Sequence, residues 1–423
     1  MQLQGATNEQ LQAYEAELAQ AYQALKNEKL SLDITRGKPS AAQVGIADKL
    51  DGILNGNYIS DSGIDTRNYS DPRGLPEMRE LGGELLACPA SNVIAAGNSS
   101  LMLMFFTALL HHNYGVDGDR SAWKNMANPK FICPVPGYDR HFTICENLGI
   151  EMITAPMTDT GPDMDVVEEM IKNDDEIIGI WCVPKYSNPT GVIYSNDTVE
   201  RIARLGKIAN PNFRVFWDNA YVVHDLTDKP QPVASLWDYA VKNGTENSIW
   251  MFASSSKISF AGGGVAWVAG SDSNLKALDS LLIVAIIGFD KVNHLRHAKL
   301  FPNEAALRNQ MIAHAASIKP KFDAVFDALN SELKEYGSWT QADGGYFCSF
   351  DTQPGLAKKV VQLAADAGVK LTPAGATFPY RNDPQDSNIR IAPTFPKAED
   401  VVKAMEVFCV CVKLATVQML TNA

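Results

Sequence analysis

The amino-acid sequence predicts an α/β protein in which a mostly parallel sheet is covered by helices on both faces and joined to a smaller α+β domain. From about residue 90 to 270, short apolar segments alternate with amphipathic segments of about 10–14 residues, which is typical of parallel strands connected by helices. In addition, unusual polar residues follow several predicted strand ends, where open α/β sheets bind their ligands.

The N-terminal segment is expected to form an amphipathic helix that packs on the rest of the chain or on a second copy. Its apolar residues recur every three or four positions: Leu11, Tyr14, Leu18, Tyr22 and Leu25. The segment LDITRGKPS (32–40) contains Gly37 and Pro39, so a loop follows the helix.

The alternating region is predicted to contain seven strands and three helices. The strands are expected within 92–97, 130–138, 150–156, 177–184, 214–221, 248–254 and 264–271. The helices are expected within 99–112, 164–173 and 196–209. Most strands are continuous apolar runs, as expected for a sheet buried on both faces.

The C-terminal part is expected to leave the sheet through long helices and form the smaller domain. A helical region covers about 272–300, and a second one covers 301–333. The segments 344–350, 369–375 and 388–395 then predict an α+β unit that ends in a helix from Lys397. We therefore divide the chain into an N-terminal arm (1–45) that contributes to the small domain and a dimer, a large domain (46–310) and a small domain (311–423).

Composition excludes several classes of protein. The net charge of −12 over 423 residues argues against nucleic-acid binding, which normally requires a basic surface. The seven cysteines are odd in number and show no CxxC spacing, so we expect reduced thiols, no zinc site and a cytoplasmic location. The longest apolar runs, about ten residues each, are too short to span a membrane, and the N-terminus has no signal-peptide pattern.

One lysine stands in an unusual setting. Lys257 lies in SSSKISFAGGG (254–264), directly after a predicted strand and without another charged residue from 249 to 270. Asp218 follows a second apolar strand, where a carboxylate requires a positive partner. Tyr138, Asn188 and Tyr221 also follow predicted strands, although singly Tyr221 suits a core tyrosine and Asn188 a turn.

These residues fit one ligand when they are taken together. The segment AAGNSS offers backbone N–H groups at a helix start, which is a ready anion site. A planar ring with a basic nitrogen, a phenolic oxygen, a phosphate and an aldehyde would use all of these groups. That ligand is pyridoxal 5′-phosphate (PLP), which requires a lysine and an acidic partner for its ring nitrogen.

The chain resembles the class I, fold-type I PLP-dependent aminotransferases, and within them the aspartate aminotransferase subgroup related to the MocR effector domain. The resemblance runs from Gly37 to Arg390. Eight motifs occur in the family's order: RGKP, YSDPRGLPEMR, AGNSS, PGYDRH, NPTG, DNAY, SxSK and IRIAPTF.

The resemblance implies a role for each matching residue. Lys257 would join the cofactor as an imine, and Asp218, backed by His141, would pair with the ring nitrogen. Tyr221 and Asn188 would bind the ring oxygen, and Tyr138 would stack on the ring. The remaining roles concern the phosphate and the substrate: Gly97, Asn98, Ser99, Ser254 and Ser256 for the phosphate, Tyr69 for the phosphate of a neighbouring subunit in a homodimer with shared active sites, Gly37 for close approach to the substrate, and Arg390 for its α-carboxylate.

Two alternatives remain open for single residues. A structural salt bridge is the rival explanation for the apolar setting of Arg390, because a buried guanidinium requires a partner. The family commonly places an arginine eight residues after the lysine to hold the phosphate, but this chain has Val265 there. Backbone N–H groups and serines, or a cation from 290–299, are expected to replace it.

The implied activity is transfer of the amino group of L-aspartate to 2-oxoglutarate by a ping-pong, Schiff-base mechanism. Arg36, Lys291 and Arg296 are the candidate cations for the distal carboxylate of such substrates. A broad-specificity aminotransferase, including aromatic, kynurenine or 2-aminoadipate types, is the alternative. A PLP lyase or decarboxylase and a PLP-binding sensor are the other classes; the short acidic segment before LDITRGKP argues against a fused DNA-binding module.

Overall fold

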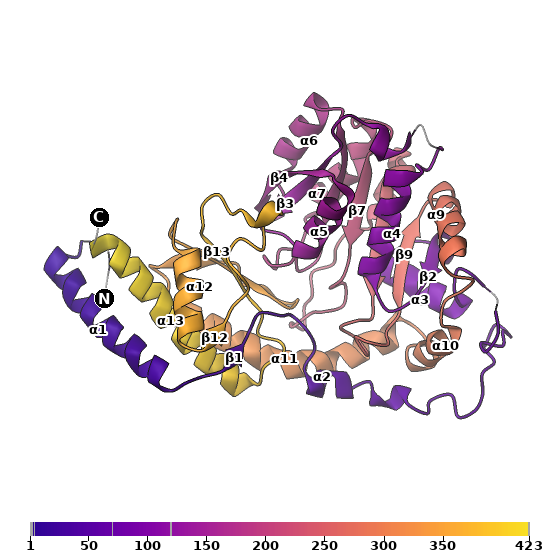
Figure 1. Cartoon of the computed structure of the whole chain (residues 1–423). Coiled ribbons are helices and arrows are strands. Elements are labelled where there is room, and N and C mark those ends of the chain that lie inside the picture. Colours follow the sequence, from indigo (N-terminus) through magenta and orange to yellow (C-terminus); the bar gives the residue numbers. More distant parts are fainter. Residues whose placement is uncertain (1–2, 4, 70, 119–120, 422–423) are drawn as a thin grey trace.

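A computed structural model of the chain describes residues 3, 5–69, 71–118 and 121–421 (Figure 1). A sheet in the order β2-β9-β8-β7-β6-β3-β4-β5 forms the centre of the larger part. Its eight strands are β2 (Val93–Ala95), β3 (Lys130–Val135), β4 (Glu151–Thr158), β5 (Gly161–Pro162), β6 (Ile177–Cys182), β7 (Arg214–Asp218), β8 (Ile249–Ser254) and β9 (Ala266–Gly270). All seven predicted strands are present, and the two-residue β5 was not predicted.

The sheet is mostly parallel, as predicted. The neighbouring pairs β8–β7, β7–β6, β6–β3 and β3–β4 are parallel, whereas β9 runs antiparallel to β8 and β2, and β5 runs antiparallel to β4. Parallel neighbours end at the same edge of the sheet, which brings polar residues after β6, β7 and β8 together.

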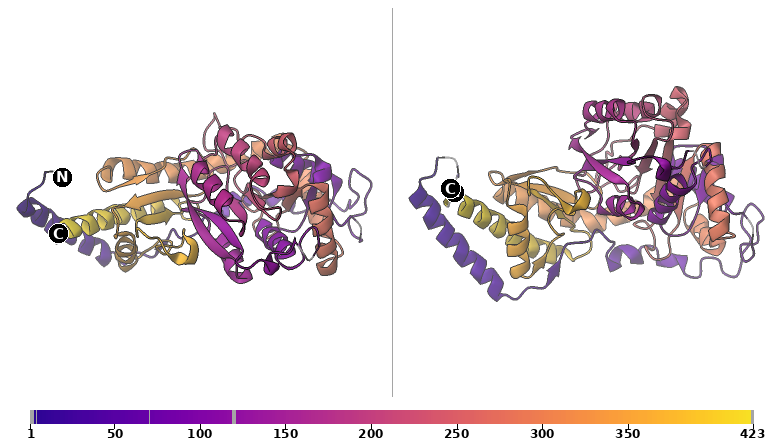
Figure 2. Two further views of the ribbon diagram at one scale, coloured as in Figure 1. Left: turned by 90° about the horizontal axis from the view of Figure 1, so that it is seen from above. Right: turned by 45° about the horizontal axis from the view of Figure 1, so that its top comes forward.

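Helices cover both faces of the sheet, which confirms the predicted architecture (Figures 1 and 2). Along β7, Val215 and Trp217 pack into one core while Phe216 packs into the other, because successive side chains of a strand point to opposite faces. The face of Phe216 is covered by α4 (Ser100–Asn113), α5 (Asp139–Leu148) and α9 (Asp272–Ala285). The helices on the other face are α3 (Pro76–Leu86), α6 (Met164–Asn173), α7 (Asn196–Arg204), α8 (Leu236–Asn243) and α10 (Lys291–Leu300).

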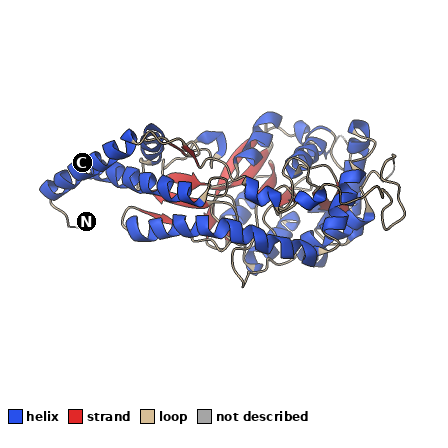
Figure 3. Cartoon of the chain, turned by 90° about the horizontal axis from the view of Figure 1, so that it is seen from below, coloured by secondary structure: helices blue, strands red, loops and turns tan. Residues whose placement is uncertain are grey.

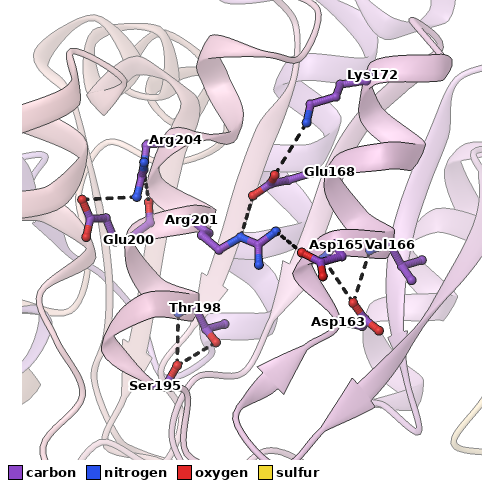
Figure 4. A network of polar contacts seen from close by, with 10 residues as sticks. All are labelled: Asp163, Asp165, Val166, Glu168, Lys172, Ser195, Thr198, Glu200, Arg201 and Arg204. Carbon is purple, nitrogen blue, oxygen red and sulfur yellow. Dashed lines mark hydrogen bonds and ion pairs between the residues drawn. The ribbon is translucent and has the colours of Figure 1, made fainter.

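Ion pairs join α6 to α7 on the outside of this layer (Figure 4). Arg201 of α7 contacts Asp165 at 2.6 Å and Glu168 at 2.7 Å. Because Asp165 is largely exposed, its contact with Arg201 adds little to stability.

The smaller part has its own sheet and core. Antiparallel strands β10 (Gly337–Trp339), β11 (Cys348–Thr352) and β13 (Asn388–Ile391) form a three-stranded sheet, and β1 (Leu32–Asp33) pairs with β12 (Val369–Lys370). The helices here are α11 (Glu304–Glu332), α12 (Ala357–Asp366) and α13 (Ala398–Thr421), and a short α2 (Ala41–Gly45) lies along the N-terminal segment.

The predicted N-terminal helix is present as α1 (Asn8–Asn27) and packs beside α13 at the end of the molecule where both termini lie (Figures 1 and 3). Leu11 and Leu18 form a small core with Leu414 and Val417. By length and composition α13 could cross a membrane, which no apolar run in the sequence suggested, but 61% of its apolar window is buried inside the fold.

The long helix α11 extends through both parts of the molecule. Leu307 packs in a core of the large sheet, whereas Phe322 and Leu329 pack in the core of the small part. The predicted domain boundary at 310/311 falls inside this helix, and the division into 1–45, 46–310 and 311–423 stays a prediction.

Candidate active site

A cavity lies at the carboxyl ends of the central strands. Eight of the predicted site residues line it: Ser99, Tyr138, Asn188, Asp218, Tyr221, Ser254, Ser256 and Lys257. They end or follow β2, β3, β6, β7 and β8, so chain segments that are far apart in sequence meet at one edge of the sheet.

Lys257 occupies a short loop that is fastened to α11. The carbonyl oxygen of Ile258 accepts hydrogen bonds from Gln310 Nε2 at 2.7 Å and from His314 Nε2 at 2.9 Å. The ammonium nitrogen lies 4.8 Å from the centre of the Tyr221 ring. Burial lowers the pKa of Lys257, and the Asp218 carboxylate opposes this only in part. The buried site therefore favours the neutral amine form of Lys257 more strongly than water would.

Asp218 is held from behind by a histidine. Its Oδ2 atom lies 3.0 Å from Nε2 of His141, which stacks on Trp181 at 4.3 Å between ring centres. The other carboxylate oxygen, Oδ1, is buried and has no hydrogen-bond partner among the described residues. Because a buried carboxylate oxygen requires a donor, Asp218 is prepared to receive one from a ligand in the cavity.

Two tyrosines flank this carboxylate. Burial is the main cause that raises the pKa of both Tyr138 and Tyr221, and the negative charge of Asp218 adds to the shift in each case. Both phenols therefore remain protonated at neutral pH and can donate a hydrogen bond.

The start of α4 forms another wall of the cavity. Ser99 caps the helix by accepting a hydrogen bond from the Met102 N–H, and Ser100 and Leu101 also line the cavity. The unpaired N–H groups of a first helical turn attract anions. Beside them, Ser256 Oγ donates to the Asn98 carbonyl at 3.1 Å, so this hydroxyl must rotate before it can donate to a ligand.

Gly97 and Asn98 lie at this wall rather than among the residues that line the cavity. A Cβ atom at Gly97 would meet no atom within 4 Å, so its backbone faces open space. Asn98 Nδ2 donates to the Gly262 carbonyl at 3.2 Å and thereby joins the loop after β2 to the loop that contains Lys257.

Val265 is fully buried and takes no part in the cavity. Its N–H donates to Ser255 Oγ at 2.8 Å, and its carbonyl accepts from the Ser255 N–H at 2.7 Å. Polar side chains of α10 hold the loops around it from outside. Asn293 Nδ2 lies 2.9 Å from the carbonyls of Gly263 and Gly264, His294 Nε2 lies 2.8 Å from the Ala96 carbonyl, and His297 Nε2 lies 2.8 Å from Ser259 Oγ.

Arg390 reaches the site from β13 of the small part. Its Nη1 atom lies 3.3 Å from Asn188 Oδ1, and its guanidinium covers the ring of Phe347 at 4.9 Å. Gly37 touches the same ring, because a Cβ atom there would lie 2.3 Å from Phe347 Cζ. The geometry thus adds a second reason for glycine at this position, beside the predicted approach of the substrate.

Like Gly37, Gly97, Asn98 and Arg390, four further predicted residues are not among those that line the cavity of this chain: Tyr69, Arg36, Lys291 and Arg296. Tyr69 is 76% exposed, and Arg36 and Arg296 are also exposed. Lys291 is buried at the start of α10. Their predicted roles therefore stay predictions.

Several site residues were not predicted. Leu101, Met104, Val183 and Ala220 line the cavity, and Tyr346, Phe347 and Asp139 surround Lys257 and Arg390. Asp139 had a local signal, since it directly follows Tyr138 in a predicted motif. Phe347 had none, because its contact with Gly37 depends on how the small part packs.

The residues present fit PLP. The buried, unpartnered Asp218 oxygen suits a protonated ring nitrogen, and the helix start beside Ser254 and Ser256 suits a phosphate. Lys257 is the cationic residue of the cavity lining and suits the aldehyde.

Comparisons with known proteins agree with this geometry. The sequence model of the family described as "Aspartate amino-transferase" matches residues 6–423. An aspartate aminotransferase of Corynebacterium glutamicum is 41% identical over 423 residues, covering 99% of this chain and 98% of the relative.

Solved structures show the same similarity. The crystal structure of an aspartate transaminase from C. glutamicum ATCC 13032 matches with a TM-score of 0.96 at 40% identity and covers 99% of both chains. An alpha-aminoadipate aminotransferase of Thermus thermophilus, complexed with N-(5'-phosphopyridoxyl)-L-leucine, shares the fold at a TM-score of 0.74 and 18% identity, covering 96% of this chain and 98% of its own. The chain therefore belongs to the aspartate amino-transferase family and is a PLP-dependent aminotransferase.

Proposed function

We propose that the protein transfers the amino group of L-aspartate to 2-oxoglutarate, giving oxaloacetate and L-glutamate, with PLP as its cofactor. The observation that carries this proposal is the shared cavity of Lys257 and the unpartnered Asp218 oxygen, with Arg390 at its Asn188 side. The choice of aspartate is supported by the relative of that activity at 41% identity.

The cofactor would be held by residues from both walls of the cavity. Lys257 would bond to its aldehyde carbon, Asp218 would bind the ring nitrogen, and the first turn of α4 with Ser254 would receive the phosphate. Asn188 and Tyr221 would bind the ring oxygen, and Tyr138 would cover the ring. When bound, PLP supplies an electron-accepting ring that stabilises negative charge at the substrate α-carbon.

The chain's own residues orient the substrate and move its proton. Arg390 would bind the α-carboxylate through two parallel hydrogen bonds, which fixes the α-carbon relative to Lys257. Because burial lowers the pKa of Lys257, its freed amine would take the proton from the substrate α-carbon as a general base and, as a general acid, donate it to the cofactor rather than back to that carbon.

We further propose that two copies form a homodimer in which Tyr69 completes the partner's phosphate site. Tyr69 is exposed, and the ion pair between Arg73 and Asp279 at 2.6 Å ties the segment after it to α9. Exposed apolar side chains gather near the end of that helix: Ile283, Val284, Ile286 and Ile287. Several exposed apolar side chains so close together in the chain support contact with another chain.

A cytoplasmic location also belongs to this proposal. All seven cysteines are free thiols, although Cys409 and Cys411 lie on one helix and Cys133 lies near Cys145. This agrees with a reducing compartment.

The absorption spectrum of the purified protein tests the proposed activity. Aspartate is expected to shift the visible band of the bound cofactor to the near ultraviolet, and 2-oxoglutarate is expected to restore it. A band that ignores aspartate but responds to aromatic amino acids, kynurenine or 2-aminoadipate would favour the broad-specificity alternative. A band that responds to no amino acid would favour a sensor, and a response without formation of oxaloacetate would favour a lyase or decarboxylase.

A further inference from the structure

Arg390 already binds a carboxylate of its own chain. Its Nη1 atom lies 3.3 Å from Oδ1 of Asp139, the first residue of α5. Arg390 is on β13 of the small part, and α5 belongs to the large part, so the ion pair joins the two parts beside Asn188 and Tyr138, which line the cavity. The guanidinium that we propose for the substrate α-carboxylate is thus shared with Asp139.

The geometry of this ion pair suits a contact in which Arg390 can change its partner better than a permanent link between the two parts. The contact is made through a single atom, Nη1, and 3.3 Å is long for a hydrogen bond between charged groups, which usually measures about 2.7–2.9 Å. A free carboxylate can approach the same guanidinium with two parallel and shorter bonds.

The Asp139 carboxylate can be hydrated when a substrate displaces it from Arg390. Its side chain is 34% exposed, so it can regain water, whereas the Arg390 side chain is only 9% exposed and depends on a partner. The position of Asp139 in the first turn of α5 favours its negative charge with or without Arg390.

We infer that Asp139 is an exchangeable counter-ion that neutralises Arg390 in the substrate-free enzyme and is displaced by the carboxylate of each incoming amino acid or 2-oxo acid. This inference rests on the proposed role of Arg390. Each substrate must compete with the Asp139 carboxylate for Arg390, so Asp139 lowers the affinity of the enzyme for every substrate.

The test measures binding of two non-reacting acids to the holoenzyme by calorimetry. Asp139→Asn removes the competing charge with little change in shape, and Asp139→Ser is a second variant in case the first folds poorly. We expect succinate and propionate to bind more tightly to Asp139→Asn by the same factor, roughly 3- to 10-fold, which corresponds to an ion pair of about 1 kcal/mol.

Asp165→Asn provides a matched control. Asp165 also lies in the first turn of a helix and also pairs with an arginine, Arg201, but outside the cavity (Figure 4). A general effect of removing one negative charge from this acidic protein would tighten binding in both variants, whereas exchange at Arg390 tightens it only in Asp139→Asn.

Four results would overturn the inference: unchanged affinity in Asp139→Asn, weaker affinity, tightening for succinate alone, or equal tightening in Asp165→Asn. Weaker affinity together with a lower melting temperature would identify a structural brace between the two parts. Aspartate turnover is followed separately, so tighter succinate binding without turnover would refute the proposed substrate while the exchange at Arg390 stands.

Discussion

Substitution of Gly37 by alanine is expected to weaken substrate binding through Phe347. A Cβ atom at residue 37 would lie 2.3 Å from Cζ and 2.6 Å from Cε1 of that ring. Ordinary contact begins near 3.4 Å, so the ring or the backbone must move by about 1 Å. Phe347 is buried and supports the Arg390 guanidinium at 4.9 Å, so the displacement is passed on to the substrate carboxylate site.

The expected size follows from the packing. Overfilling a well-packed site costs about 1–3 kcal/mol, and each 1.4 kcal/mol is tenfold in affinity. We expect kcat/KM for aspartate to fall roughly 5- to 150-fold in Gly37→Ala, with a matching loss of succinate affinity.

Steady-state kinetics and succinate calorimetry measure this effect, and two variants control it. Gly45→Ala lies in the same N-terminal region, and its added Cβ atom would meet only Asp48 at 3.6 Å, so it should behave as the unmodified protein. Adding Phe347→Leu to Gly37→Ala removes the clash and should recover part of the loss. If Gly37→Ala keeps the original KM and succinate affinity, then Phe347 does not transmit strain to Arg390 and the reasoning fails.

Three further predictions follow from other parts of the site. The Val265→Arg variant is expected to unfold at a much lower urea concentration, because residue 265 is fully buried and an unpaired charge there is destabilising. The variant is not expected to retain PLP more tightly, and improved retention of PLP would contradict this prediction. Burial lowers the pKa of His294 from 6.5 to about 4. Below pH 6.5 the unfolded chain therefore binds more protons at this residue than the folded chain does. From this residue alone, the free energy of unfolding should fall by about 2 kcal/mol when the pH is lowered from 7 to 5. Urea titrations of His294→Gln should show a correspondingly smaller pH dependence, and an identical dependence would refute the assignment. Among Arg36→Gln, Lys291→Gln and Arg296→Gln, one is expected to raise KM for aspartate without raising it for alanine; equal effects on both substrates in all three would remove these cations from the distal site.

Much of the large sheet was predictable from sequence because its signals are local. Most of the seven predicted strands are apolar runs of a few residues, and burial on both faces requires no partner residue to be known. The polar residues of the cavity were predictable for a related reason. Asp218, Tyr221 and Asn188 interrupt or follow such runs, where a polar side chain needs an explanation.

The missed elements depend on packing rather than on local sequence. Helices α3, α5, α8 and α12 have 8–11 residues, a length at which an isolated helix is unstable and tertiary contacts decide. The predicted helical region over 272–300 is divided into α9 and α10 after Ala285. Asp290 marks the new start, since its side chain accepts a hydrogen bond from the Asn293 N–H.

The contacts of the carboxylate-binding site were beyond prediction for the same reason. Arg390 lies 251 positions from Asp139 and 202 positions from Asn188 in the chain. The sequence indicated that Arg390 requires a partner, but only the ion pair between β13 and α5 shows that the partner is a carboxylate of the chain itself.

The contacts of α10 connect local opening of the fold to retention of the cofactor. Through Asn293, His294 and His297 this one helix holds the loop after β2 and the loop that contains Lys257, both of which contribute residues to the cavity. If α10 detaches, both loops lose their outer support in the same event. Binding of PLP against these loops should therefore slow hydrogen exchange at the amides of α10, although none of these three side chains lines the cavity.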